Sequence, residues 1–126
     1  MAIHQEVTVA CNAAKVYEAL TSSKQFSEFT GAAADIGGEE GGEFSCFDGQ
    51  ITGRTLELRA NEMIVQAWRA NAWPEGVYSI VRFTLNQDGD DTRVTLDQSG
   101  FPEDMTAHLD GGWHKMYWEP LKAYCA

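Results

Sequence analysis

The chemically reactive side chains of this chain are few and widely spaced. Its three cysteines, Cys11, Cys46 and Cys125, are odd in number and include no short Cys-x-x-Cys pair. This arrangement predicts neither a disulfide framework nor a zinc site. Cys46 has no group near it in sequence that would lower its pKa, so we expect a buried and unreactive thiol there.

The three histidines, His4, His108 and His114, are scattered as well. His108 and His114 point in different directions on a helix, because they lack the i, i+4 spacing of a metal-binding pair. Asp104 and Asp110 each lie four residues before one of these histidines, which favours a local charge pair. We therefore expect no metal site and no cofactor.

The sequence shows no arrangement of residues that is typical of an enzyme. It contains no Gly-x-Ser-x-Gly motif and no recognisable set of Ser, His and Asp around a nucleophile. Four carboxylates that could come close together, Asp35, Glu39, Glu40 and Glu43, lie in or beside a flexible Gly-rich segment, where preorganised acid-base catalysis is not expected. We expect a protein that is not an enzyme.

Composition narrows the choice of partner and compartment. Nine Lys and Arg stand against nineteen Asp and Glu, a net charge of -10, which argues against nucleic acid and anionic membranes as partners. The 126 residues suit one domain spanning 1–126. No apolar window of about 18 residues occurs, and the N-terminus does not resemble a secretory signal, so we expect a cytoplasmic protein.

Hydrophobic patterning predicts one strand, two short helices, a series of strands and a final helix. Asn12 is the expected N-cap of the first helix, 13–21, and a second helical segment covers 24–29. Gly53 is the expected position of a β-bulge. The expected strands, several joined by short turns, are 3–9, 32–36, 43–47, 50–59, 63–69, 77–87 and 91–98.

The last helix, expected over 105–125, is the only element long enough to cover a sheet. Asp104 is its expected N-cap, while Gly111-Gly112 and Pro120 weaken it, so tertiary contacts must hold it. It is either a core helix with close backbone approach at the glycines or one wall of a ligand cavity. At helical spacing its inward stripe comprises Met105, Leu109, Trp113, Met116, Tyr117, Leu121 and Tyr124.

Strands joined by short hairpins must be antiparallel neighbours, so these elements predict an α+β fold with a curved antiparallel sheet around the C-terminal helix. In the order of its strands and helices, the chain resembles the helix-grip fold of the START-like, Bet v 1-like SRPBCC superfamily. Within it the sequence is most similar to the family of activators of the heat-shock protein 90 ATPase. The residues that carry the likeness are Gly41-Gly42 and Phe44, Asp48 to Gly53, Ile64 to Arg69, Trp73 to Gly76, Thr92 to Val94, Gly100 to Pro102 and Gly112-Trp113.

The resemblance implies a sheet of about six strands wrapped round a long C-terminal helix, with two short helices after the first strand. It also implies two kinds of function. The superfamily binds apolar small molecules between sheet and helix, and the family contacts a heat-shock protein 90 type chaperone. We expect a non-enzymatic binding domain for a small apolar ligand, with chaperone contact as the alternative and either a monomer or a homodimer.

The expected ligand site joins inward-facing strand residues to the C-terminal stripe. A mostly apolar pocket with a few polar groups is typical of ligand sites, but the same residues could simply fill the core. The members are Phe44, Gln66, Trp68, Ser79, Val81, Phe83, Trp113, Met116 and Tyr117.

A second expected site, for a partner protein, comprises Arg69 and Trp73 near the rim of the sheet. Tryptophan and arginine are common in protein-contact hot spots. The alternative is that Trp68 points inward and Trp73 covers its loop, since tryptophan is highly buried on average.

Overall fold

The computed structural model describes residues 2–126. Its elements follow the expected order, with a C-terminal helix made of four consecutive segments. They are β1 (Ala2–Val9), α1 (Ala13–Thr21), α2 (Ser23–Thr30), β2 (Ala34–Ile36), β3 (Glu43–Cys46), β4 (Ile51–Arg59), β5 (Met63–Ala70), β6 (Ser79–Asp88), β7 (Asp91–Ser99), η1 (Glu103–Met105), α3 (Thr106–Gly112), η2 (Trp113–Trp118) and α4 (Glu119–Cys125).

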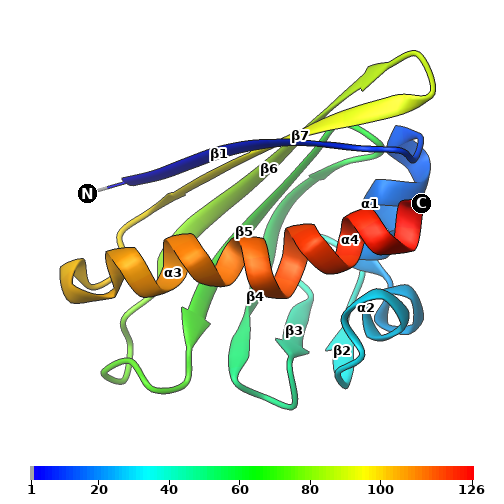
Figure 1. The fold of residues 1–126 in the computed structure, drawn as a ribbon. Helices are drawn as coiled ribbons and strands as arrows, with labels where there is room; N and C mark the ends of the chain where they lie inside the picture. Colours follow the sequence, from blue (N-terminus) through cyan, green and yellow to red (C-terminus); the bar gives the residue numbers. More distant parts are fainter. Residues whose placement is uncertain (1) are drawn as a thin grey trace.

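The strands form one curved antiparallel sheet across which the C-terminal helix runs (Figure 1). The order of strands is β1-β7-β6-β5-β4-β3-β2, so consecutive hairpins are neighbours and the first strand pairs with the last. The sheet has the seven strands that the sequence pattern predicted, where the family resemblance implied about six, and the predicted helix-grip architecture is confirmed.

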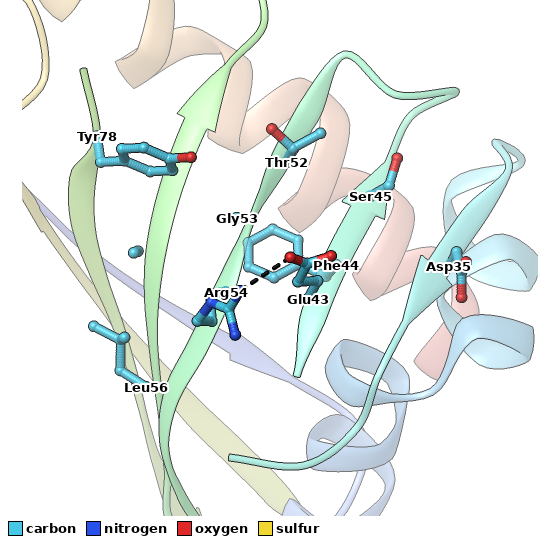
Figure 2. A pocket seen from close by; sticks show the side chains of 10 residues that line it. Asp35, Glu43, Phe44, Ser45, Thr52, Gly53, Arg54, Leu56 and Tyr78 are labelled. Atoms are coloured by element: carbon cyan, nitrogen blue, oxygen red, sulfur yellow. Dashed lines mark hydrogen bonds and ion pairs between the residues drawn. The ribbon is translucent and has the colours of Figure 1, made fainter. Parts of the chain in front are cut away.

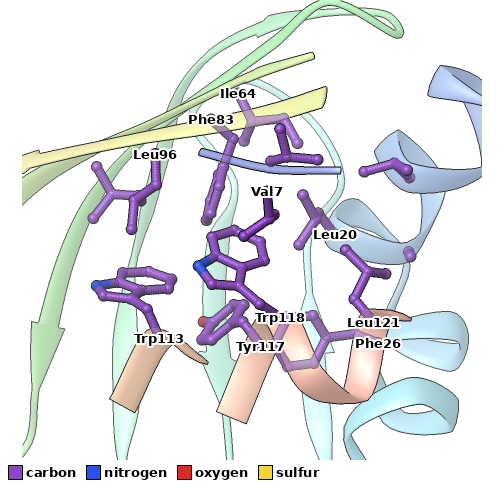
Figure 3. Packing of buried hydrophobic residues seen from close by; sticks show 14 of the residues in the cluster. Val7, Leu20, Phe26, Ile64, Phe83, Leu96, Trp113, Tyr117, Trp118 and Leu121 are labelled. Carbon is purple, nitrogen blue, oxygen red and sulfur yellow. The ribbon is translucent and has the colours of Figure 1, made fainter. Parts of the chain in front are cut away.

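Alternating hydrophobicity places one face of the sheet against the helix. In β1 the buried residues are Ile3, Gln5, Val7 and Val9, as the alternation predicts. Gln5 lies opposite Leu96 of β7 in the antiparallel register. The helix side chains meet these strand residues in the core, where Phe83, Trp113, Tyr117 and Trp118 lie close together (Figure 3).

The two short helices begin at polar caps. The Asn12 side chain accepts a hydrogen bond from the backbone N–H of Lys15 at 2.8 Å, which confirms it as the N-cap of α1. Ser22 caps α2 in the same way through Gln25. Gly31 ends α2 in the left-handed conformation that glycine adopts without strain.

The start of the C-terminal helix differs from expectation. Asp104 is not an N-cap: it lies inside the 3₁₀ turn η1. α3 begins at Thr106, and Met105 at its N-cap position gives no side-chain cap. The turn is anchored instead by Pro102, whose carbonyl accepts from the N–H of Met105. The 3₁₀ turn thus takes the place of the predicted cap.

The middle of this helix, η2, is π-helical, and it ends where the N–H of Glu119 bonds to the carbonyl of His114, five residues back. Pro120, which follows directly, has no N–H to give the α-helical bond to Met116. The wider turn brings Trp118 into the core and leaves Met116 43% exposed, so the predicted inward position of Met116 is wrong. A constant 3.6-residue period cannot show this shift.

A disulfide joins Cys11 to Cys125, with an S–S distance of 2.05 Å, and corrects the expectation that the cysteines form none. The two residues are 114 positions apart, so spacing alone could not pair them. The bond ties the segment before α1 to the end of α4. Cys46 is a free thiol buried in β3, as expected.

The bulge in β4 lies between Thr55 and Glu57, so Gly53 is not its position. Gly53 pairs regularly with Trp68 of β5. A Cβ at Gly53 would lie 1.9 Å from the carbonyl oxygen of Ala67 and 2.7 Å from the Phe44 ring. Glycine is required here by close approach rather than by a bulge.

Candidate ligand cleft

An open cleft of about 460 Å³ lies between the C-terminal helix and the turn that joins β3 to β4. Its volume falls in the range of small-molecule sites, roughly 300–1,000 Å³. The helix, the β3–β4 turn and β5 supply its lining. The lining residues are Phe47, Gln50, Ile51, Trp68, His108, Leu109, Gly111, Gly112, Trp113, Lys115, Met116 and Tyr117.

Two glycines keep the helix side of the cleft open. A Cβ added at Gly111 or Gly112 would meet no atom within 4 Å, so the expected close backbone approach at these glycines is absent. Both residues line the cleft directly before the π-helical segment η2. π-helical turns are rare and frequently mark functional sites.

The inner wall of the cleft is aromatic. The ring centroids of Trp113 lie 5.3 Å from Trp68 and 4.4 Å from Tyr117, and Phe47 lies 5.5 Å from Tyr117. Burial raises the pKa of the Tyr117 phenol well above its ordinary value. The wall therefore presents uncharged, flat surfaces to anything that enters.

A chain of buried hydrogen bonds holds this wall in place. The Trp113 indole Nε1 donates to Gln98 Oε1 at 2.8 Å, and Gln98 Nε2 donates to Ser79 Oγ at 3.1 Å. Ser79 in turn donates to the Trp68 carbonyl at 2.7 Å. Two residues of the wall, Trp113 and Trp68, are thus connected through β6 and β7.

A second glutamine supports the next turn of the helix. Trp118 Nε1 donates to Gln5 Oε1 at 2.7 Å, and Gln5 Nε2 donates to Asp110 Oδ1 at 2.9 Å. Asp110 therefore pairs with Gln5 and not with His114, its expected partner. Among residues 2–126, neither His108 nor His114 forms an ion pair within 4 Å.

One polar group on the wall has no partner. Trp68 is 3% exposed, and its Nε1 makes no hydrogen bond within residues 2–126, although its indole neighbours the Tyr117 hydroxyl. A buried N–H without an acceptor costs about 1–3 kcal/mol.

The structure divides the nine predicted ligand residues among three places. Trp68, Trp113, Tyr117 and the exposed Met116 line the cleft. Phe44, Gln66 and Phe83, again with Tyr117, surround a separate void of only about 10 Å³. Ser79 and Val81 are completely buried and line no cavity described within residues 2–126. Part of the predicted set is thus core, as the alternative interpretation held.

Several lining residues were not anticipated from the sequence. Phe47, Gln50 and Ile51 lie at a turn whose position over the helix depends on sheet curvature. His108 and Lys115 were assigned to no site. The alternation of buried Thr92, Val94, Leu96 and Gln98 along β7 could have revealed Gln98 as an inward polar group.

At the sheet rim, Trp73 is 5% exposed and its ring lies 5.7 Å from that of Trp68. Trp73 therefore covers its loop, which leaves little of the ring for a partner. The Arg69 guanidinium donates to the carbonyls of Trp73, Pro74 and Val77, at 2.8, 3.3 and 3.2 Å. Arg69 thus stabilises this loop.

A second hollow, of about 500 Å³, lies on the face of the sheet away from the helix (Figure 2). It contains an ion pair in which Arg54 Nη2 lies 2.9 Å from Glu43 Oε1. Tyr78 and Leu56 line it and are about half exposed. The guanidinium of Arg69 lies 5.8 Å from the Tyr78 ring centroid, so an aromatic ring and a cation meet here.

No group of three or more His, Cys, Asp or Glu side chains in residues 2–126 is placed to hold a metal ion. Burial raises the pKa of the Cys46 thiol to about 12, which keeps it protonated at neutral pH. No helix in this range is long and apolar enough to cross a membrane.

The sequence matches the family model described as Activator of Hsp90 ATPase homolog 1-like protein over residues 10–126. A human relative, Activator of 90 kDa heat shock protein ATPase homolog 1, is 28% identical over 108 residues, 86% of this chain and 32% of its own length. A Dictyostelium discoideum relative is 32% identical over 113 residues, 89% of this chain and 30% of its length. The chain thus spans about a third of these relatives.

Two solved structures share the fold. An HSP90 activator from Plasmodium falciparum superposes with a TM-score of 0.92 at 20% identity, covering 98% of this chain and 95% of that one. The Aha1 dimer from Colwellia psychrerythraea gives a TM-score of 0.82 at 20% identity, with 98% and 95% covered. At this identity the likeness concerns the fold alone.

Proposed function

The chain belongs to the Activator of Hsp90 ATPase homolog 1-like family, and on that basis we propose that it is a non-enzymatic binding domain whose cleft holds a small apolar ligand. The observation that supports this most is the aromatic cleft of about 460 Å³ beside Gly111 and Gly112. Its lining contains no carboxylate and only one histidine, which offers little for acid-base catalysis.

Mass measurement of the intact protein tests this proposal. We expect native mass spectrometry of the freshly purified protein to show an excess mass that disappears on denaturation. Gly112→Leu should abolish the excess mass, because the new side chain would enter open space in the cleft without displacing any atom within 4 Å of its Cβ. Ala123→Leu adds the same side chain at an exposed position of α4 and should keep it.

A bare mass that stays unchanged after soaking with fatty acids and aromatic compounds would overturn the proposal. The same conclusion would follow if Gly112→Leu carried as much added mass as the original protein. Because Leu forms helices better than Gly, loss of the ligand in this variant could not be attributed to unfolding.

The family relationship favours a second function, contact with a 90 kDa heat-shock protein. The face of the sheet away from the helix suits this role, since Tyr78 beside Arg69 is 49% exposed and Ile80 is 47% exposed. Exposed aromatic and arginine residues are common in protein interfaces. Tyr78 is therefore a better contact residue than the buried Trp73.

Calorimetric titration with the purified chaperone from the same source tests this second function. We expect Tyr78→Ser combined with Ile80→Ser to weaken binding at least tenfold, while Gly112→Leu leaves it unchanged. The absence of any binding heat with the original protein would exclude it.

A further inference from the structure

The cleft mouth carries a charge opposite to that of the chain as a whole. The protein has a net charge of -10, with nineteen acidic residues. Yet the twelve residues that line the cleft include Lys115 and His108 and not one Asp or Glu. A lining that contains no carboxylate leaves the Lys115 ammonium able to attract an anion at this opening.

Both basic groups are available to a ligand. Neither Lys115 nor His108 forms an ion pair or a side-chain hydrogen bond within the part of the chain that the structure describes, 2–126. Asp110, the nearest acidic residue between them in sequence, is engaged with Gln5. The five arginines of the sheet, by contrast, all have partners. Arg54, Arg59, Arg82 and Arg93 form ion pairs with carboxylates, and Arg69 donates to backbone carbonyls.

The interior of the cleft requires a different chemistry from its mouth. Its wall is made of Phe47, Ile51, Trp68, Trp113 and Tyr117, so it favours an apolar body. A ligand that satisfies both regions is amphipathic, with an apolar body inside and a negative group at the surface. Lys115 and His108 both lie on the helix side of the opening, which fixes where that group would be.

We propose that the cleft binds an apolar monocarboxylate, with its carboxylate between Lys115 and His108 and its apolar body against Trp68 and Trp113. This inference rests on the proposed ligand-binding function and specifies its ligand class. A charge-assisted hydrogen bond from an ammonium to a carboxylate is stronger than one between neutral groups.

Matched acid and alcohol probes test the headgroup separately from the body. We would measure the dissociation constants of decanoate and decanol, and of naphthoate and naphthylmethanol, by calorimetry with the whole chain. The expected result is that an acid binds at least tenfold more tightly than its alcohol. The first pair probes a flexible body and the second a flat one, so their comparison identifies which body fits.

Lys115→Met should remove the preference for the acid, because it weakens binding of the acid more than binding of the alcohol. Methionine keeps an unbranched apolar stem at this exposed position, so the fold should persist. Lys122→Met, at an exposed position of α4 outside the cleft lining, is the matched control and should keep the preference. His108→Gln should weaken acid binding less than Lys115→Met does, since it retains a hydrogen-bond donor.

The outcomes distinguish a failure of the proposed ligand binding from a failure of the proposed carboxylate site. If neither acids nor alcohols bind, the proposed ligand-binding function fails and this inference fails with it. If acid and alcohol bind equally well, or if Lys115→Met changes the affinity for neither of them, the proposed ligand binding stands and the anionic headgroup is excluded. Tighter binding of the alcohols would exclude it equally.

Discussion

The indole rings of Trp113 and Trp118 lie almost parallel, with their centroids 6.0 Å apart and an interplanar angle of 21°. Residues five apart diverge on an α-helix, but the π-helical segment η2 brings these two onto one side. Each indole N–H then reaches a buried glutamine, Gln98 for Trp113 and Gln5 for Trp118. The irregular turn and the two glutamines therefore belong to one arrangement.

Replacement of Gln98 tests this arrangement. Gln98→Leu leaves the Trp113 N–H without its acceptor and removes a donor to Ser79, so we expect the free energy of unfolding to fall by about 2–3 kcal/mol. Urea unfolding gives the measurement. Gln50→Leu, at an exposed position, is the control and should change the free energy of unfolding by less than about 0.5 kcal/mol. Equal effects in the two variants would contradict a special role for Gln98.

Two glycine substitutions should act in opposite directions. Gly53→Ala would force a methyl group against the Ala67 carbonyl and the Phe44 ring, so it should lower the free energy of unfolding by about 3 kcal/mol or more. The methyl group of Gly111→Ala would lie in open space on a helix, so this change should raise the free energy of unfolding by about 0.5–1 kcal/mol. Thermal unfolding of both variants provides the test, and a stable Gly53→Ala protein would contradict the packing described.

The Cys11–Cys125 bond should stabilise the fold strongly, because it closes a loop of more than a hundred residues. We expect reduction with dithiothreitol to lower the free energy of unfolding by about 3–5 kcal/mol. The double variant Cys11→Ser with Cys125→Ser should unfold like the reduced protein and should not respond to dithiothreitol. An unchanged unfolding midpoint after reduction, with free thiols verified by mass, would show that the bond contributes no stability.

The Cys46 thiol should make stability depend on alkaline pH. Its pKa is about 12 in the folded protein, against about 8.5 for an exposed thiol. Above about pH 9 the unfolded state loses this proton while the folded state keeps it, so the free energy of unfolding should fall, by up to about 1.4 kcal/mol per pH unit.

Below the pKa of the Cys46 thiol in the unfolded state, the thiol is protonated in both states and its contribution to stability is fully present. We therefore expect this group to cause no change in the free energy of unfolding between pH 6 and 8. Urea unfolding at pH 8 and at pH 10, compared between the original protein and Cys46→Ala, isolates the effect of the thiol. The variant should show a smaller loss at pH 10. Rapid alkylation of Cys46 in the native protein at pH 8 would contradict its burial.

Much of the fold follows from local patterns. Alternation identified β1, β6 and β7, turn residues separated the hairpins, and Asn12 marked the start of α1. These features depend on neighbours in sequence, which periodicity and propensity describe well. The short hairpins, and the lack of any other element long enough to cover the sheet, predicted how the sheet and the helix fit together, and the family resemblance implied the same arrangement.

The parts that sequence reasoning missed depend on distant contacts. The pairing of Cys11 with Cys125 needs the final position of both chain segments. The exchange of Met116 for Trp118 in the core follows from the π-helical turn, which a fixed helical period does not contain. Phe47 and Ile51 joined the cleft because the sheet curves over the helix, a feature of the tertiary structure.

The disulfide also determines how the molecule would respond to a pulling force. Force applied at Ala2 and Ala126 would pass through β1 to Cys11, across the sulfur bridge to Cys125, and would leave residues 12–124 unloaded. Detachment of β1 from β7 would add little length, because a β-strand is already extended at about 3.3 Å per residue. After reduction the same force would extend the whole sequence, on the order of 400 Å. A redox change would thus convert a mechanically shielded fold into an extensible one.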